Sequence, residues 1–375
     1  MSITANDKIN SIGTYAFAEV DNEVAKLRSI GIEPIDFGVG DPKDPTPEIV
    51  RESIKKAVEA RKSSGYPSYT GTEEYRKEIS KWCNERFGIN LDYKKEVTST
   101  IGAKEAVFNF PQAFIKNGDY VIAPNPGYPP YERGTLFAGG KTYFLPLLKE
   151  NNFLMDLNSI PKDIIKKSKI LWVNYPNNPT GAIAPEEFFK EVTDFGQDNR
   201  LIIASDECYT EIYFKEKPHS ILEYSKEGVV AFQSLSKRSN MTGYRVGWVA
   251  GDENTLSIFK KLKTNIDSGT PTFIQDAAIS ALKDETHVED MRNKYKKKRD
   301  ILVDALTSIG LEDCTPDATL YIWQKVPEKM DSVGFAKKLL QKEIAVVVTP
   351  GAWISNTFEG SNPGNDFVRF ALVPS

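Results

Sequence analysis

The segment Val229-Val-Ala-Phe-Gln-Ser-Leu-Ser-Lys237-Arg-Ser-Asn-Met-Thr-Gly-Tyr-Arg245-Val-Gly-Trp-Val-Ala250 joins two apolar runs through a polar loop. The runs 229–233 and 246–250 are rich in Val, Phe and Trp, and they predict two buried strands. The loop holds Lys237 among hydroxyl side chains, with Arg245 further along. A lysine held there loses hydration, which favours the neutral amine that forms imines.

Short β-rich runs alternate with helical patterns from about residue 46 to residue 250. The strands that we expect are Val97–Thr100, Tyr120–Ala123, Thr142–Leu145, Ile170–Asn174, Leu201–Ser205, Val229–Gln233 and Val246–Ala250. Helical candidates include Glu73–Phe87, Lys104–Phe114 and Pro185–Asp198, with Pro185 suited to a first turn. This alternation predicts an α/β fold in which crossover helices connect the strands of one sheet.

The pattern changes after residue 270. A long charged helix is expected from about Val288 to Ser308, and short strands are expected at Leu320–Trp323, Ile344–Val348 and Val368–Leu372. We therefore expect two domains. The large one spans residues 46–275, and a smaller α+β domain is built from residues 1–45 and 276–375.

The composition argues against several classes of function. The chain has 375 residues, of which 40% are apolar and 27% charged, and its formal net charge is −4. This mildly acidic balance argues against nucleic acid as the main partner. No apolar run approaches the roughly 20 residues of a membrane span, and residues 1–10 lack a signal-peptide core. We expect no membrane association and a cytoplasmic location.

Cysteine and histidine are scarce. The three cysteines lie far apart, so a disulfide framework is not expected. His219 and His287 are the two histidines, and neither sits in a recognisable catalytic motif, so no metal site is expected either.

Polar groups follow several of the expected strands, where ligands of open α/β sheets collect. Asp206 comes directly after the run 201–205, and a buried carboxylate there is costly unless it meets a positive partner. A protonated pyridine nitrogen would be attracted by on the order of 4 kcal/mol at about 4 Å. The alternative is that Asp206 caps a helix N-terminus.

A phosphate site is also suggested near the lysine. Ser234, Ser236 and Arg245 suit a phosphate, and Thr100-Ile-Gly-Ala-Lys-Glu105 opens a helix whose N–H groups attract anions. Pyridoxal 5′-phosphate (PLP), an aldehyde that carries a phosphate, needs this combination of groups. The match of residues 234–237 to S-x-x-K would instead require a K-T-G strand, which the chain lacks.

Two further motifs allow a local or a functional interpretation. Asn177-Asn-Pro-Thr-Gly181 is a turn with suitable turn chemistry, but its amide groups and Tyr209 could also bond a phenolate oxygen. Pro126-Gly-Tyr-Pro-Pro130 holds Tyr128 in a rigid turn, where its ring either stacks on a planar cofactor or packs in the core.

An arginine interrupts the apolar run Phe367-Val-Arg-Phe-Ala-Leu-Val373. A guanidinium binds a carboxylate through two parallel hydrogen bonds, which fixes orientation as well as charge. Arg369 is therefore a candidate for substrate binding, and an edge-strand arginine that reaches solvent is the alternative.

Taken in order, from Phe37-Gly-Val-Gly-Asp-Pro42 to Phe367-Val-Arg-Phe-Ala371, these motifs resemble the fold-type I PLP-dependent aminotransferases of the aspartate aminotransferase superfamily. The resemblance implies a mostly parallel seven-stranded sheet and catalysis by Lys237, Asp206 and Tyr209. Lys237 would form the internal aldimine and later act as the general base. The cofactor would be held by Ala103, Lys104, Tyr128, Asn178, Asp206, Tyr209, Ser234, Ser236, Lys237 and Arg245.

The resemblance also implies a homodimer with shared active sites. Tyr66, in Tyr66-Pro-Ser-Tyr-Thr-Gly71, matches the tyrosine that reaches the phosphate of the neighbouring subunit. Arg369 matches the arginine that grips the substrate α-carboxylate, with Gly40 and Asn178 beside it. Amino transfer between an amino acid and a 2-oxo acid is the implied reaction.

Several motifs are similar in wording to the LL-diaminopimelate aminotransferase branch, in which Tyr15 and Lys104 would also touch substrate. Ala103 departs from this branch, which usually has serine there, and Ala318-Thr-Leu-Tyr-Ile-Trp323 looks closer to N-succinyl-diaminopimelate aminotransferases. Both branches imply 2-oxoglutarate as acceptor and a role in lysine biosynthesis. Aspartate, alanine or aromatic aminotransferase activity and a PLP-dependent β-lyase are the alternatives. A PLP-binding regulator would normally carry an added DNA-binding domain, and because no basic winged-helix segment is recognisable in the sequence, we do not expect a regulator.

Overall fold

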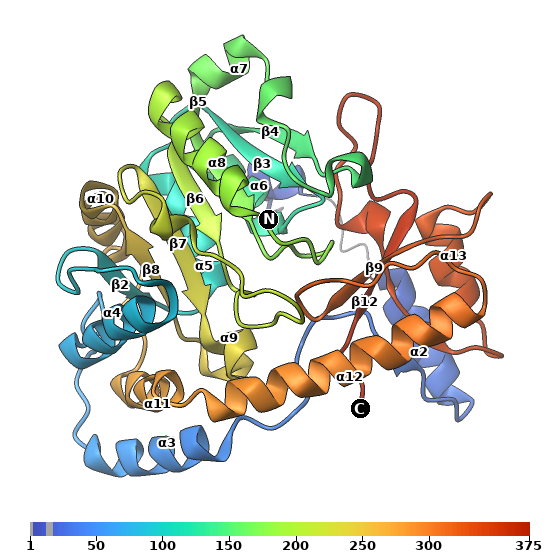
Figure 1. The fold of residues 1–375 in the computed structure, drawn as a ribbon, viewed down its shortest axis with the longest axis horizontal. Coiled ribbons are helices and arrows are strands. Elements are labelled where there is room, and N and C mark those ends of the chain that lie inside the picture. The colour runs from blue at the N-terminus through green and yellow to red at the C-terminus, as the bar shows by residue number, and fades with distance from the viewer. Residues whose placement is uncertain (1–2, 13–17) are drawn as a thin grey trace.

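The computed structural model describes residues 3–12 and 18–375, and its largest element is a seven-stranded sheet (Figure 1). Its strands are β2 (Val97–Thr100), β3 (Tyr120–Asn125), β4 (Lys141–Pro146), β5 (Ser168–Asn174), β6 (Ile202–Asp206), β7 (Val229–Ser234) and β8 (Gly247–Gly251). The spatial order is β2-β8-β7-β6-β5-β3-β4. β8 is antiparallel to β2 and β7, and the other pairs are parallel. The predicted mostly parallel sheet is therefore confirmed.

Helices cover both faces of this sheet and extend beyond it. In chain order they are α1 (Asp7–Asn10), α2 (Ala18–Ser29), α3 (Glu48–Ala60), α4 (Glu73–Phe87), α5 (Ala103–Asn109), α6 (Pro129–Ala138), α7 (Lys162–Lys167), α8 (Glu186–Asn199), α9 (Leu235–Arg238), α10 (Glu253–Lys263), α11 (Thr272–Leu282), α12 (Thr286–Ser308) and α13 (Ser332–Leu339).

Alternate residues of the central strands pack into two separate apolar clusters. Leu171 and Val173 of β5 join α4, α8 and α11 on one face, whereas Ile170 and Trp172 join α5, α6 and α10 on the other. A strand that is buried on both faces needs apolar residues at every position. This explains why the central strands read as continuous apolar runs in the sequence.

Two helix boundaries differ from those expected. The helix expected over 104–114 is α5 followed by a 3₁₀ turn at Phe110–Ala113, because Pro111 has no N–H to continue the α-helical bonding. Pro185 precedes α8 in an extended conformation instead of occupying its first turn.

The C-terminal part of the chain forms smaller sheets. β11 (Thr349–Pro350), β12 (Phe367–Ala371) and β9 (Tyr321–Lys325) form an antiparallel sheet with β12 in the middle, while β1 (Ile35–Asp36) pairs in parallel with β10 (Val346–Val347). Of the strand expected over 344–348, only Val346–Val347 forms a strand, β10, and β11 begins one residue beyond the expected range. The predicted domain limits at residues 46 and 275 stay a prediction.

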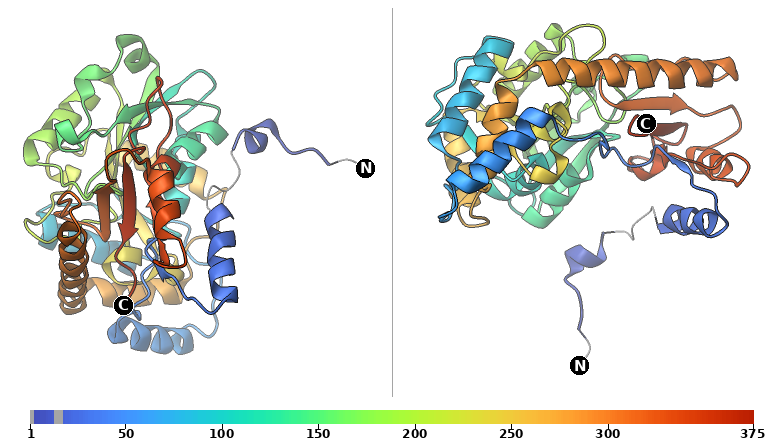
Figure 2. Two further views of the ribbon diagram at one scale, coloured as in Figure 1. Left: turned by 90° about the vertical axis from the view of Figure 1, so that its right-hand side faces the viewer. Right: turned by 90° about the horizontal axis from the view of Figure 1, so that it is seen from below.

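Helix α12 spans the molecule from the region of the large sheet to the small sheets (Figure 1). Its buried residues Val288 and Met291 share an apolar cluster with Ile322 of β9 and with Val368 of β12. Figure 2 shows that the start of the described N-terminal segment points outward, while Lys8 of α1 donates to the Phe137 carbonyl of α6 at 2.7 Å. No helix in residues 3–12 and 18–375 is long and apolar enough to cross a membrane.

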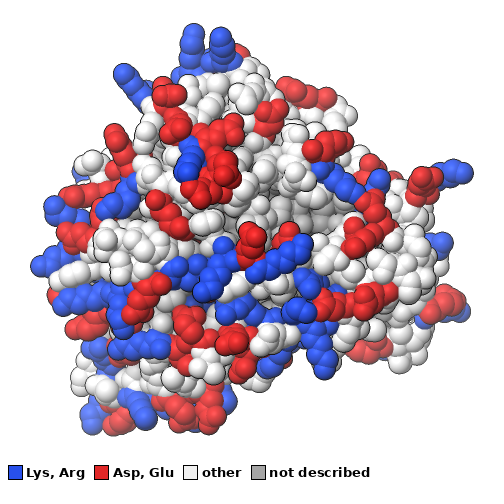
Figure 3. All heavy atoms as spheres, viewed as in Figure 1, with Lys and Arg blue, Asp and Glu red and all other residues white. Residues whose placement is uncertain are grey.

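The face seen in Figure 3 carries charges of both signs side by side. On the exposed side of α12, for example, Lys296 Nζ lies 3.0 Å from an oxygen of Asp300. Charges interspersed in this way do not form the single-sign surface that a nucleic-acid backbone attracts.

Candidate active site

A cavity of about 400 Å³ lies where the carboxyl ends of β5, β6 and β7 face the small sheets. Asn174, Asp206 and Ser234 are the last residues of these three strands, and all three line the cavity. The predicted site residues that line it are Gly40, Ala103, Lys104, Tyr128, Asn178, Asp206, Tyr209, Ser234, Ser236, Lys237, Arg245 and Arg369. Residues that are up to 329 positions apart in the chain are thus brought together.

Lys237 lies on α9, the short helix that follows β7 directly. The side chain of Ser234 caps this helix by accepting from the backbone N–H of Ser236 at 3.1 Å. The half-buried Lys237 side chain enters the cavity, and its Nζ donates to the carbonyl oxygen of Gly40 at 2.5 Å. A Cβ on Gly40 would overlap the Tyr321 ring and hydroxyl, so glycine at this position leaves room for Tyr321 beside the cavity.

Asp206 presents a buried carboxylate to the cavity. It accepts hydrogen bonds from the Tyr131 hydroxyl at 2.8 Å and from the Cys208 backbone N–H at 3.3 Å, which are neutral donors. Burial raises the pKa of Asp206, and the hydrogen bond from Tyr131 opposes that shift. A carboxylate in this state gains free energy from a cation that enters the cavity, as a protonated pyridine ring would. The helix-cap alternative is wrong, because Asp206 ends a strand and faces the cavity.

Tyr131 and Tyr321 are functional candidates that the sequence reasoning missed. Tyr131, in the first turn of α6, stacks on Trp172 at a centroid distance of 4.9 Å and holds Asp206. The Tyr321 hydroxyl, from β9, lies 3.1 Å from the Tyr209 hydroxyl. Tyr131 comes three positions after Tyr128, so both residues lie near the start of α6. This spacing was the feature of the sequence that could have indicated that Tyr131 lies near the cavity.

A first anion site is formed by residues at the end of β7 and at the start of α5. The Ser234 hydroxyl donates to the Ser236 hydroxyl at 3.0 Å, and Arg245 Nη1 approaches the Ser236 hydroxyl at 3.5 Å. Gly102 has φ +74°, and a Cβ there would overlap the Arg245 guanidinium. The first turn of α5 follows Gly102, so Ala103 and Lys104 line the cavity next to Arg245. Hydroxyls, a guanidinium and helix N–H groups together suit a phosphate.

Arg369 provides a second anion site from the small sheet. Its Nη1 donates to Asn178 Oδ1 at 3.1 Å and its Nη2 to the Gly38 carbonyl at 3.0 Å, and the guanidinium lies 4.5 Å from the centre of the Tyr321 ring. The buried Nε–H has no hydrogen-bond partner in the described part of the chain, so donor capacity is left for a ligand oxygen. The edge-strand alternative is wrong, because β12 lies between β11 and β9.

The cavity is also lined by three residues that we expected beside the cofactor ring, Asn178, Tyr209 and Tyr128. Because Asn178 Oδ1 accepts from Arg369, its amide N–H₂ is the end directed to donate elsewhere. Burial raises the pKa of Tyr209 well above its usual value, which keeps the hydroxyl protonated as a donor. The ring of Tyr128, just before α6, meets Tyr131 edge-on at 5.9 Å.

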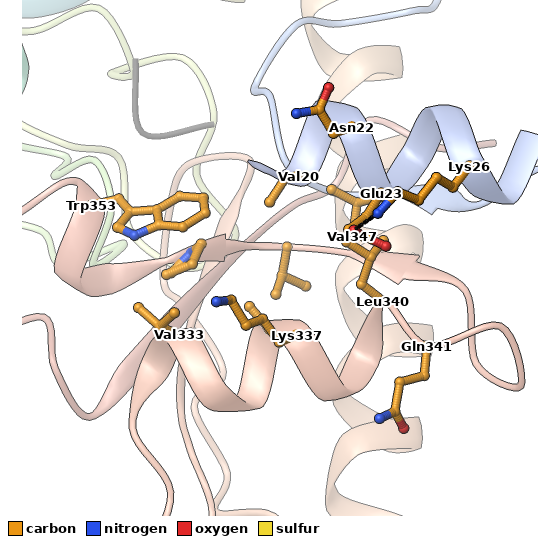
Figure 4. A pocket seen from close by; sticks show the side chains of 13 residues that line it. Val20, Asn22, Glu23, Lys26, Val333, Lys337, Leu340, Gln341, Val347 and Trp353 are labelled. Atoms are coloured by element: carbon orange, nitrogen blue, oxygen red, sulfur yellow. Dashed lines mark hydrogen bonds and ion pairs between the residues drawn. The ribbon is translucent and has the colours of Figure 1, made fainter. Parts of the chain in front are cut away.

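Two predicted residues lie outside this cavity. Tyr66 is 91% exposed and does not line it, and Tyr15 falls outside the described residues. A second cavity of about 430 Å³ lies between α2 and α13 (Figure 4), but it contains none of the predicted site residues. In residues 3–12 and 18–375, no group of three or more His, Cys, Asp and Glu side chains could hold a metal ion.

The large, mostly parallel sheet carries a lysine, a buried carboxylate and one anion site at its carboxyl edge, and the small sheet that faces it carries a second anion site. This arrangement is typical of α/β enzymes of fold type I. The chain belongs to the aminotransferase class I and II family, whose family model matches residues 32–364. The predicted family and the predicted amino-transfer class of reaction are therefore confirmed.

Similar proteins cover nearly the whole chain. An LL-diaminopimelate aminotransferase of Aquifex aeolicus is 45% identical over 359 residues, which is 95% of this chain and 92% of that protein. An aminotransferase structure from Neisseria meningitidis superposes with a TM-score of 0.91 at 34% identity, covering 99% of this chain and 96% of that chain. A probable N-succinyldiaminopimelate aminotransferase structure from Thermus thermophilus has a TM-score of 0.89 at 29% identity and covers 96% of both chains.

Asp206→Asn is expected to stabilise the cofactor-free protein at neutral pH. Because burial raises the pKa of Asp206 in the folded state, wild-type stability falls as pH rises from the unfolded-state value of about 3.9 through the folded-state value. The variant lacks this loss, so its melting temperature should exceed that of wild type by on the order of 1–3 °C at pH 7. The difference should vanish near pH 4. Exposed Asp198→Asn is the control, and equal behaviour of the two variants would contradict the assignment.

Proposed function

We propose that this aminotransferase binds PLP in the cavity around Lys237 and transfers the amino group of LL-diaminopimelate, or of its N-succinyl derivative, to 2-oxoglutarate. The observation that carries the proposal is the position of the Lys237 amine, in one cavity with the buried Asp206 carboxylate and two separate anion sites. When bound, PLP supplies an aldehyde that condenses with amines and a ring that takes up an electron pair.

The lysine has two tasks in this proposal. Its Nζ would hold the cofactor through the aldehyde group until the substrate amine takes its place. The free Lys237 amine would then serve as the general base that accepts and gives back the substrate α-proton. The Gly40 carbonyl supports these tasks, because it accepts from Nζ and orients the amine inside the cavity.

The other cofactor contacts follow from the positions of the side chains. Asp206, braced by Tyr131, would keep the pyridine nitrogen protonated, and Asn178 and Tyr209 would donate to the ring oxygen. Tyr128 would stack on the ring. The phosphate would be bound by Ser234, Ser236, Arg245 and the backbone N–H groups of Ala103 and Lys104.

The substrate would bind through its α-carboxylate at Arg369, next to Gly40 and Asn178. A guanidinium that is already held by Asn178 and Gly38 loses little side-chain entropy on binding, which favours a fixed orientation of the substrate. Lys104, which is exposed, and Tyr15 would also touch the substrate.

The choice of donor is supported by two kinds of similarity. The Aquifex aeolicus relative is named for LL-diaminopimelate, and the Thermus thermophilus structure for N-succinyldiaminopimelate. Both substrates are long and carry a carboxylate at each end. The cavity offers a cation for each end, at Arg369 and at Lys104. This proposal assigns the enzyme to lysine biosynthesis and to the cytoplasm, a reducing compartment in which three free cysteines are stable.

Lys237→Ala is expected to abolish covalent attachment of PLP and to lower kcat by about 10²–10⁴-fold or more, because both nucleophile and general base are lost. Borohydride reduction followed by peptide mass spectrometry measures the attachment. Lys104→Ala is the matched control, since Lys104 also lines the cavity, and it should keep the label. A label on any other lysine of the wild-type protein would refute the role of Lys237.

A panel of donors with 2-oxoglutarate tests the substrate. We expect kcat/KM for LL-diaminopimelate or N-succinyl-LL-diaminopimelate to exceed that for aspartate, alanine and phenylalanine by at least about tenfold. Glutamate formation is the measured quantity. A preference for aspartate or an aromatic donor would overturn the substrate assignment and leave the aminotransferase class intact. Pyruvate and ammonia formed without an acceptor would point to a β-lyase.

The same proposal includes a homodimer with shared active sites and the division into domains at residues 46 and 275. Tyr66 is 91% exposed, although it is a large aromatic residue, and Tyr69 is 44% exposed in the same loop. Exposed tyrosines are typical of interfaces, where the ring is buried and the hydroxyl still finds a partner. The extended N-terminal segment with Ile3, which is 94% exposed, also suits a contact with a second copy.

Mixed dimers test this sharing. A dimer of one Lys237→Ala subunit and one Tyr66→Ala subunit, purified with two different tags, should recover about half of the wild-type activity. If Tyr66 acts across the interface, the site with Lys237→Ala also receives the Tyr66→Ala change from the other subunit. The second site then has both an intact Lys237 and an intact Tyr66. If Tyr66 acts within its own subunit, each site is defective and the mixed dimer stays inactive.

A further inference from the structure

The segment that follows Lys237 is bonded to both places where the chain passes between the two proposed domains. Thr46 Oγ1 donates to the Asn240 carbonyl at 2.7 Å, and residue 46 begins the proposed large domain. Arg238 Nη1 donates to the Ala281 carbonyl at 2.8 Å, near the end of α11. The lysine-bearing turn is therefore held at the two domain junctions.

Arg238 is the first part of this attachment. Its side chain is 3% exposed, pairs with Glu285 between α11 and α12, and lies 5.5 Å from the centre of the Trp82 ring. Trp82 Nε1 also donates to the same Glu285 oxygen at 3.1 Å. A buried guanidinium with these partners cannot leave them without a large desolvation cost, so the turn is fixed in one position.

Ser239 and His287 are the second part. The His287 ring lies between Asp284 Oδ2, at 2.6 Å from Nδ1, and the Ser239 hydroxyl, at 2.8 Å from Nε2. Because the Asp284 carboxylate accepts, Nδ1 carries the proton in the neutral ring and Nε2 accepts from Ser239. The Ser239 oxygen accepts in turn from Arg238 Nη1 at 3.1 Å. The donors thus run in one direction, from Arg238 through Ser239 and His287 to Asp284.

His287 also belongs to the helix that carries packing into the small sheet. It lies in the first turn of α12, and the next residue, Val288, is fully buried in the cluster that contains Val368 of β12. Arg369 follows Val368 on that strand. A continuous set of packed and hydrogen-bonded groups therefore joins the turn of Lys237 to the strand of Arg369.

We propose that Arg238, Ser239 and His287 are positioning residues that fix the turn of Lys237 against the α11–α12 junction, so that the lysine keeps its alignment with Arg369. The inference rests on the proposed role of Lys237. None of the three residues lines the cavity, so they act through the turn and not on the substrate. His287 is the informative member, because its two ring nitrogens bond two different elements.

Two replacements of His287 separate these bonds. In His287→Asn the amide group takes the place of Nδ1, which retains the contact with Asp284 and loses the one with Ser239. In His287→Gln the longer amide reaches the place of Nε2 and retains the contact with Ser239. For the full-length protein, with and without PLP, we expect His287→Asn to speed amide hydrogen exchange over residues 235–240 by about tenfold. The kcat should fall by about fivefold to tenfold, with KM changed less than about twofold.

His287→Gln should stay within about twofold of wild type in both measurements. Ser239→Ala removes the same hydrogen bond from the other side and should reproduce His287→Asn, which keeps the test valid if the histidine variant folds poorly. Lys296→Ala, on the exposed face of α12, is the control that should change neither quantity. Equal effects of the Asn and Gln variants, or unchanged exchange over 235–240 in both His287→Asn and Ser239→Ala, would overturn the proposal.

Exchange in the cofactor-free protein does not depend on catalysis. Faster exchange in His287→Asn, combined with a Lys237 that does not bind PLP, would contradict the proposed role of Lys237 while the positioning role of His287 stands. The failure of one proposal can thus be told from the failure of the other.

Discussion

The carboxylate of Asp206 is buried at the end of β6 with a tyrosine hydroxyl and a backbone N–H as its hydrogen-bond donors, and this unfavourable burial is the constraint on which the site depends. Tyr131 can brace it because Tyr131 stacks on Trp172 of the neighbouring strand. The core of the large sheet therefore holds a charge that is costly without a cationic ligand. Burial of this carboxylate lowers the stability of the folded protein, and a cation bound beside it would restore that stability.

The two anion sites come from different parts of the fold. Ser234, Ser236 and Arg245 follow β7 of the large sheet, whereas Arg369 belongs to β12 of the small sheet. The Lys237 amine lies in the cavity that both parts line, so in the proposed function a ligand with two negative groups would contact both parts beside this amine. The amine also donates a hydrogen bond to the carbonyl of Gly40, in the N-terminal part of the chain before α3. In the proposed function, cofactor and substrate would therefore meet where the large sheet faces the small one.

Most of the sheet was predictable because its central strands are buried on both faces and read as apolar runs. Asp206, Lys237 and Arg369 were recognisable as site candidates because each is a charged residue in or beside such a run, where an unpaired charge is costly, and the structure places all three at one cavity. Tyr131 and Tyr321 were not predictable in the same way. A tyrosine in a helix or strand is usually a core residue, and their roles arise from contacts with residues 75 and 112 positions away.

The sequence by itself determined the α/β alternation, the approximate positions of the strands of the large sheet and the identity of the chemical groups, because these depend on local periodicity and on the cost of burying charge. Tertiary structure alone decided that Gly40 approaches Lys237, that β12 is a central strand, and that Arg238 and His287 attach the lysine turn to α12. Contacts between residues far apart in the chain depend on how the helices and strands pack, and local sequence patterns do not specify which distant residues come together.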